Sequence, residues 1–172
     1  MVVCSILKIM KKKPKWKTGR MFITDAKQTT KPSFAIGRPS NQMSAIGLGY
    51  ERKLKKELEK LTNYTVYHNP WFIYNLTNYC SPDFMLWPNE EDLPLIVVEC
   101  KLKYVKDGTD KLNNLYIPVV KKALKIKEEP IGIVIAKSLT PEVKTTIPTL
   151  SSAKPFKNNI MLWLPMTGRI LC

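Results

Sequence analysis

The sequence predicts one α/β domain with a mixed central sheet flanked by helices. Two apolar runs rich in β-branched residues, 94–102 and 131–136, have the length of buried strands. Apolar residues at helical spacing lie between these runs, and a second amphipathic stretch precedes them. A strand, helix, strand sequence of this length predicts a right-handed parallel crossover, whereas a short turn joins antiparallel strands. The sheet is therefore expected to contain both kinds of pairing.

The first helix is expected over residues 49–61. Its apolar stripe consists of Tyr50, Leu54, Leu58 and Leu61. Glu51 falls at the edge of this stripe, from where it could reach a site at the end of the sheet. The alternative is a surface glutamate paired with Lys55 four residues on. Glu57 and Glu59 are competing candidates for an acid that reaches the site.

Aromatic and β-branched residues at 64–68 and 71–74 predict a strand that is bent at Pro70. We expect this aromatic cluster to pack in the core and on strand faces in preference to forming a platform for base stacking. His68, the one histidine of the chain, has no partner pattern around it. A structural role is favoured for it over a phosphate contact.

The run 81–87 predicts a strand that turns at 88–92 and pairs with the apolar strand 94–102. Alternation along a strand puts Glu99 and Lys101 on the same face. Burying either charge requires a partner charge or a metal ion. Asp83 on the neighbouring strand can supply a second carboxylate. Two carboxylates, a main-chain carbonyl and waters form a ligand set that suits Mg²⁺.

These residues resemble a known signature. Pro82-Asp83 followed by Glu99-Cys100-Lys101 at the end of an apolar strand is similar to the motif of the PD-(D/E)xK phosphodiesterases, which include restriction enzymes, junction resolvases and phage nucleases. Glu-x-Lys also occurs at 51–53 and 142–144, but only the middle copy closes an apolar strand after a Pro-Asp. The predicted order of elements over residues 49–137 is similar to the restriction-endonuclease-like core, α-β-β-β-α-β.

The resemblance implies a metal site and a role for each residue. Asp83 and Glu99 would hold Mg²⁺, for which Mn²⁺ should substitute, with the main-chain carbonyl of Cys100 as a further ligand. Glu51 would complete the metal cluster. Lys101 would orient the nucleophilic water and stabilise the transition state, a role that we favour over direct proton abstraction because an ammonium beside two carboxylates should stay charged.

A second helix is expected after the Glu99 strand, with Thr109 as its cap and a kink at Pro118. Some branches of the resembled family carry a glutamine ahead of a tyrosine on this helix, whereas this chain has Lys111, Leu112 and Asn113. Residues 140–156 are expected to form a loop, and 160–164 a last strand.

The charge of the chain indicates a polyanionic partner. The 172 residues include 28 lysines and arginines against 14 acids, a formal net charge of +14. Residues 1–43 hold ten of these cations and one acid, which predicts a basic arm ahead of a single domain over 44–172. In this arm Trp16 could stack on an unpaired base; a solvated tail is the alternative. The candidate nucleic-acid contacts are Lys11, Lys12, Lys13, Lys15, Trp16, Lys17, Arg20, Lys103 and Lys137.

Other classes of protein are disfavoured. The four cysteines show no Cys-x-x-Cys pairing, so zinc and a disulfide framework are not indicated. No apolar run approaches the roughly 20 residues that span a bilayer, and the start of the chain does not have the order of a secretory signal. We expect an intracellular protein of the cytoplasm, phage-infected cells included, with no membrane partner.

The sequence therefore predicts a Mg²⁺-dependent DNA endonuclease that hydrolyses phosphodiester bonds, with branched or junction DNA as a candidate substrate. A non-catalytic nucleic-acid-binding or assembly protein on the same fold is the alternative. RNA in place of DNA, and assembly as a homodimer, are left open.

Overall fold

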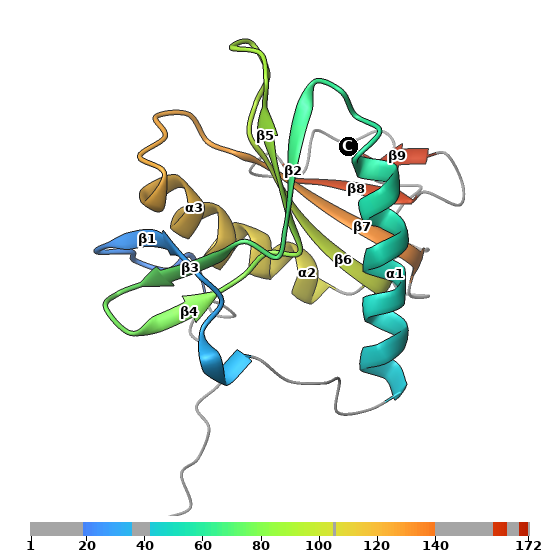
Figure 1. The fold of residues 1–172 in the computed structure, drawn as a ribbon, viewed down its shortest axis with the longest axis horizontal. Coiled ribbons are helices and arrows are strands. Elements are labelled where there is room, and N and C mark those ends of the chain that lie inside the picture. The colour runs from blue at the N-terminus through green and yellow to red at the C-terminus, as the bar shows by residue number, and fades with distance from the viewer. Residues whose placement is uncertain (1–18, 36–41, 105, 140–159, 165–168, 172) are drawn as a thin grey trace, which may run out of the picture.

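The fold is a mixed α/β arrangement of two sheets and a few helices, which confirms the predicted class (Figure 1). A computed structural model describes residues 19–35, 42–104, 106–139, 160–164 and 169–171. The predicted loop 140–156, the arm residues Lys11 to Lys17, Cys4 and Cys172 lie outside these ranges. Among the helices of the described part, none is long and apolar enough to cross a membrane.

A six-stranded sheet forms the centre of the molecule, with the order β2-β5-β6-β7-β8-β9. Its strands are β2 (Tyr64–His68), β5 (Phe84–Pro88), β6 (Ile96–Tyr104), β7 (Ile131–Leu139), β8 (Ile160–Leu164) and β9 (Arg169–Leu171). β2, β5 and β6 pair antiparallel, whereas β7 runs parallel to β6 and β8 runs parallel to β7. The predicted parallel crossover between the two apolar strands is confirmed.

Helices cover the two faces of this sheet. α1 (Gln42–Leu58) packs on one face, and the three consecutive segments α2 (Lys106–Lys111), η3 (Leu112–Tyr116) and α3 (Ile117–Ala123) pack on the other (Figure 1). Two core clusters result. Val98 belongs to the cluster on the α1 face, and Val97 belongs to the cluster on the α3 face. This alternation confirms that β6 is buried on both sides.

The two aromatic runs at 64–68 and 71–74 belong to different sheets, so the prediction of one bent strand was wrong. A second, three-stranded sheet has the order β1-β3-β4, with β1 (Ala26–Thr29), β3 (Trp71–Tyr74) and β4 (Asn78–Cys80). The chain leaves the central sheet at Asn69, which has a positive φ of 50°, and at Pro70, which cannot donate to a ladder. These two residues redirect the backbone instead of bending one strand.

Residues 19–35 are part of the folded body, although they fall within the predicted arm. β1 pairs with β3, and the N–H of Met21 donates to the carbonyl of Asn114, 2.9 Å away. A 3-10 turn, η2 (Ser33–Ala35), follows β1. The small sheet packs beside α3 and is far from α1 in Figure 1.

Both predicted helices differ from the observed ones at their starts. α1 begins at Gln42 instead of residue 49, since Gly47 and Gly49 weaken a helix without ending it. α2 begins at Lys106, so Thr109 lies inside the helix and is not its cap. The segments α2, η3 and α3 follow one another without a break, and Pro118 lies inside this helical run, at the second residue of α3 and directly after the π-helical segment.

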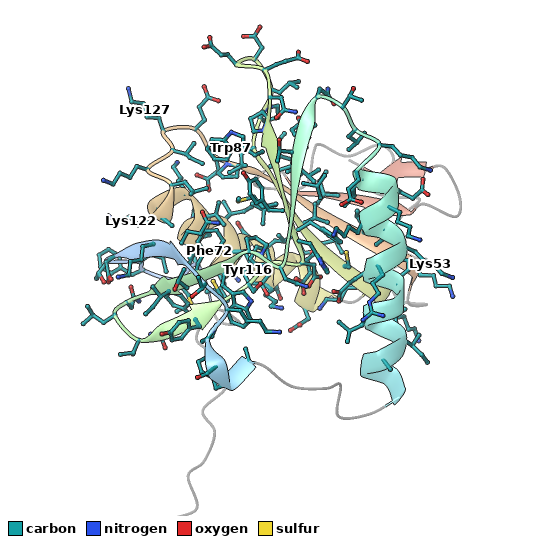
Figure 2. All side chains as sticks on the ribbon, viewed as in Figure 1. Lys53, Phe72, Trp87, Tyr116, Lys122 and Lys127 are labelled. Atoms are coloured by element: carbon teal, nitrogen blue, oxygen red, sulfur yellow. The ribbon has the colours of Figure 1, made fainter. Side chains whose placement is uncertain are left out.

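Phe72 joins the small sheet to the rest of the core. It is fully buried in the cluster that also contains Tyr116 and Val119 (Figure 2).

We expect Phe72→Ala to lower the free energy of unfolding by about 3–5 kcal/mol, because it removes a large buried side chain and leaves a cavity. Urea denaturation would measure this change. The matched control is Phe22→Ala, at a site 84% exposed, which should change stability by less than about 0.5 kcal/mol. Equal effects of the two substitutions would contradict this view of the core.

Candidate active site

Asp83 and Glu99 lie opposite each other where the antiparallel pairing of β5 and β6 ends, with Asp83 just before β5 and Glu99 inside β6. β5 and β6 pair with Phe84 opposite Val98, so the next position of this register sets Asp83 against Glu99. The Oδ2 atom of Asp83 accepts a hydrogen bond from the main-chain N–H of Cys100, with N and O 2.5 Å apart. This bond fixes the residue just before β5 against the strand that carries Glu99. The structure thus brings the two carboxylates of the predicted site together.

Glu99 is the one charged residue in the buried core of the described part of the chain, with 1% of its surface exposed. Its Oε1 atom accepts hydrogen bonds from the Nζ atoms of Lys101, at 2.7 Å, and Lys111, at 3.1 Å. Its Oε2 atom is buried without a hydrogen-bond partner. A buried carboxylate with one unsatisfied oxygen is unfavourable, so this atom is a natural position for a further cation or donor.

Burial and neighbouring charges shift the pKa values of Asp83 and Lys101. Burial, followed by the nearby carboxylate of Glu99, raises the pKa of Asp83 well above its usual range, and the hydrogen bond from Cys100 only partly opposes this. Burial lowers the pKa of Lys101, but the carboxylate of Glu99 and its hydrogen bond outweigh burial, so the net effect is a raised pKa. Lys101 is therefore held as an ammonium, while Asp83 retains its proton to higher pH than an ordinary aspartate.

Lys101 reaches Glu99 because α2 leaves room for its side chain. A Cβ atom added at Gly108 would lie 3.3 Å from Cε of Lys101, which is a tight contact. Glycine inside a helix costs about 1 kcal/mol relative to alanine, so its presence here is explained by close packing. Gly108 therefore helps to set the path of the lysine over the helix.

Lys111 and Tyr116 complete this side of the site. The Nζ atom of Lys111 lies 4.8 Å from the centroid of the Tyr116 ring, a favourable cation–π contact. Burial, then the carboxylates of Glu99 and Asp83, raises the pKa of Tyr116 well above its usual range, so its hydroxyl stays protonated. The sequence did not identify Lys111 as a site residue. On a regular α-helix, side chains five residues apart point in different directions, so Lys111 was not expected to lie beside Tyr116.

Glu51 approaches from the α1 face. Its Oε2 atom lies 3.6 Å from Nε2 of His68, and its charge contributes to the raised pKa of Asp83. The expected alternative partner, Lys55, pairs instead with Glu59 at 3.5 Å. Glu57 pairs with Lys60 at 2.7 Å on the surface. Of the three acids considered on this helix, Glu51 is the one that lies beside the site.

His68 is a neighbour of the site that sequence reasoning set aside as structural. Its ring stacks on Phe84 with the centroids 4.9 Å apart, and its Nε2 atom lies 2.9 Å from Nδ2 of Asn69. The N–H of Asn69 in turn donates to the carbonyl of Asp83 at 2.8 Å. The end of β2 therefore supports the backbone position of Asp83, and the ring of His68 lies close to Glu51.

The basic candidates lie in different places. Lys103 and Lys137 are exposed near the ends of β6 and β7. Lys103 shares a face with Lys101, whereas alternation places Lys137 on the α1 face. Arg20 forms an ion pair with Glu129, which also pairs with Lys121 at 2.8 Å. The guanidinium of Arg20 is therefore paired with an acid of the loop before β7.

The donor set decides which metal fits. Within the described residues, no group of three or more histidine, cysteine, aspartate and glutamate side chains is arranged to hold a metal. Burial raises the pKa of the Cys80 and Cys100 thiols, so neither is a ready thiolate ligand. The facing pair Asp83 and Glu99, with the unsatisfied Oε2 atom, fits Mg²⁺, which is commonly bound by one or two carboxylates and keeps several waters.

Comparison of the chain with protein-family models, with curated proteins and with solved structures gives no match. A function for this chain therefore rests on the chemistry of its own side chains.

The raised pKa of Asp83 predicts a specific dependence of stability on pH. An unfolded aspartate ionises near about pH 4, whereas the folded protein keeps this proton to higher pH. Folding is therefore penalised as pH rises from about 4 through the raised pKa. In EDTA, we expect Asp83→Asn to become more stable than the parent protein as pH rises, by at least about 1.4 kcal/mol at alkaline pH, the equivalent of one pKa unit.

Urea denaturation at several values between about pH 5 and pH 9 would measure this difference. Asp92→Asn, on the exposed turn between β5 and β6, is the matched control and should show no such trend. A constant difference between Asp83→Asn and the parent across this range would contradict the interpretation.

Proposed function

We propose that the chain is a Mg²⁺-dependent DNA endonuclease with a restriction-endonuclease-like core. The observation that carries the proposal is the meeting of Asp83, Glu99 and Lys101 at the point where the pairing of β5 with β6 ends, with one oxygen of Glu99 left without a partner. The order α1, β2, β5, β6, the α2 to α3 helices and β7 supports this core, with the β3–β4 hairpin as an insertion.

The carboxylates of Asp83 and Glu99, with the main-chain carbonyl of Cys100, would hold the cation. When bound, Mg²⁺ supplies positive charge that neutralises the phosphate and acidifies a nucleophilic water. Glu51, which lies 3.6 Å from His68 and whose charge contributes to the raised pKa of Asp83, would add negative charge to this region from the α1 face. The raised pKa of Asp83 supports this role, since a divalent cation would relieve the repulsion between the two carboxylates.

Lys101 is suited to orienting the water and stabilising negative charge. Its ammonium donates to Glu99 at 2.7 Å, and its raised pKa keeps the proton in place near neutral pH. Direct proton abstraction by Lys101 would require the loss of that proton beside two acids. We therefore assign it an electrostatic and positioning role in the hydrolysis.

Nucleic acid is the substrate that the charge of the chain favours. The formal net charge is +14, and Lys103 continues the face of β6 that carries Glu99 and Lys101. Exposed lysines near a phosphodiesterase site would bind flanking phosphates and make association sensitive to salt. DNA is proposed over RNA, and branched DNA is included among the substrates to be tested.

A cleavage panel tests the proposal. Plasmid, duplex, single-stranded, flap and four-way-junction DNA would be incubated with Mg²⁺ or Mn²⁺, and the products resolved on gels. We expect hydrolysis that EDTA abolishes. Asp83→Asn, Glu99→Gln and Lys101→Met should each lower the rate by at least about 100-fold, because each removes a carboxyl group that would hold the cation or the ammonium that would stabilise the transition state.

Lys127→Met is the matched control for loss of one positive charge. Lys127 lies on the loop before β7, at the opposite end of β7 from Lys101, and is well separated from Tyr116 in Figure 2. Cleavage that survives Asp83→Asn or Lys101→Met would defeat the residue assignment. Salt-sensitive DNA binding without hydrolysis under either metal would favour the non-catalytic binding protein.

Lys111 provides a separate test of the metal site. It competes with a cation for Oε1 of Glu99, so Lys111→Met should make the site more negative. We expect the variant to bind Ca²⁺ at least about tenfold more tightly, which corresponds to about 1.4 kcal/mol, in calorimetric titration. The control is Lys121→Met, which removes a lysine paired with Glu129 elsewhere. Unchanged or weaker Ca²⁺ binding by Lys111→Met would contradict a cation site at Glu99.

A further inference from the structure

A large open groove lies beside the candidate active site. It has a volume of about 1040 Å³ and runs between the β1 end of the small sheet, the turn from β2 to β3, and β4. Clefts that bind small ligands commonly have volumes of about 300–1,000 Å³, so this groove has room for more than a single small group. The proposed chemistry at Asp83 and Glu99 does not use it.

Three aromatic side chains of the groove face solvent. Phe34 is 71% exposed, Tyr67 is 42% exposed and Tyr79 is 38% exposed. Phe34 and Tyr79 come from η2 and β4 and meet edge to face, with ring centroids 5.3 Å apart. Of the aromatic residues in the runs 64–68 and 71–74, Phe72 and Tyr74 occupy the core, whereas Tyr67 on β2 is partly exposed and lines the groove. Phe34 and Tyr79 lie outside those two runs.

The polar lining of the groove favours an anionic ligand. Lys31 contributes an exposed ammonium, and Gln28, Asn69 and Asn78 contribute side-chain amides. None of the described residues that line the groove is an aspartate or a glutamate. Aromatic faces together with a cation and hydrogen-bonding amides are the surface that single-stranded nucleic acid uses, through base stacking and phosphate contact.

The groove ends next to the candidate active site. Ser81 lines it and lies two residues before Asp83, so no more than about 7 Å of extended chain separates them. His68 also lines it and lies 3.6 Å from Glu51, and the N–H of Asn69 donates to the carbonyl of Asp83. A strand that leaves the groove at this end would meet the catalytic carboxylates.

We propose that this groove binds an unpaired stretch of a DNA strand, with bases stacked on Phe34 and Tyr79 and a phosphate at Lys31, next to the scissile bond. The inference rests on the proposed nuclease function and names its substrate class, which is DNA with a single-stranded segment beside the cleavage point. Bases within a duplex are stacked on one another, so their faces are not available to these rings. Unpaired bases have free faces.

Binding of short oligonucleotides tests the groove without using catalysis. Fluorescein-labelled dT12 and a blunt 12-base-pair duplex would be titrated with the full chain in EDTA, with fluorescence anisotropy as the readout. We expect Phe34→Ala and Tyr79→Ala each to weaken dT12 binding by about 5- to 150-fold, the range of base–aromatic stacking. Duplex binding should change by less than about twofold. Phe22→Ala, an exposed phenylalanine outside the groove, should change neither.

Lys31→Ala is a second variant that leaves the rings in place. For dT12, it should lower the slope of log affinity against log salt by about 0.7, the value for one phosphate contact to a single strand. Parent-like dT12 binding by both ring variants, or equal losses for dT12 and duplex, would overturn the proposal. Groove-dependent binding of rU12 that is tighter than binding of dT12 would overturn the assignment to DNA.

The two proposals fail separately. Loss of dT12 binding in Phe34→Ala, together with no cleavage of any substrate, would support the single-strand-binding groove and contradict the nuclease function. The opposite result is metal-dependent cleavage of flap DNA and dT12 binding that are both unchanged in Phe34→Ala and Tyr79→Ala. It would support the nuclease function and contradict the single-strand-binding groove.

Discussion

The burial of one carboxylate, Glu99, is the constraint on which the arrangement of the candidate site depends. Glu99 lies on a strand covered on both faces, so its charge must be balanced by neighbouring groups. Lys101 balances it from the same strand, and Lys111 balances it from the helix of the parallel crossover. This arrangement ties the helix to β6 by charge as well as by apolar packing. The position of the site and the topology of the sheet are therefore linked.

The same arrangement places two carboxyl groups, those of Asp83 and Glu99, unfavourably close to each other. Asp83 faces Glu99 across the β5–β6 ladder, and the Cys100 N–H holds it there. Burial raises the pKa of Asp83, and the nearby carboxylate of Glu99 raises it further. A purely structural site would more simply use an asparagine at position 83. Stability given up at a cluster of acids is typical of functional sites, where a ligand supplies the missing compensation.

The sequence predicted the parts of this site that depend on local geometry. Strand alternation put Glu99 and Lys101 on one face, and the short turn after β5 set Asp83 opposite Glu99. It did not predict that β3 lies outside the central sheet and pairs with β1, because that pairing depends on contacts with residues 26–29, some 45 residues away. Of the exposed rings of the groove, Tyr79 belongs to this second sheet, whereas Phe34 and Tyr67 come from η2 and β2. Aromatic residues in a predicted strand are expected to be buried, and only the sheet to which the strand belongs shows whether their rings are exposed.

The π-helical segment explains the least predictable feature of the site. On a regular α-helix, residues five apart lie about 140° from each other around the axis, so Lys111 and Tyr116 would point in different directions. In η3 the Ile117 N–H bonds to the Leu112 carbonyl, five residues back, which widens the turn and allows Lys111 to lie over the Tyr116 ring. The wide turn ends at Tyr116, and Pro118 follows as the second residue of α3. One local irregularity thus directs a second lysine at Glu99. Because π-helical turns are rare and concentrate at functional sites, its presence here supports an active site on this face of the sheet.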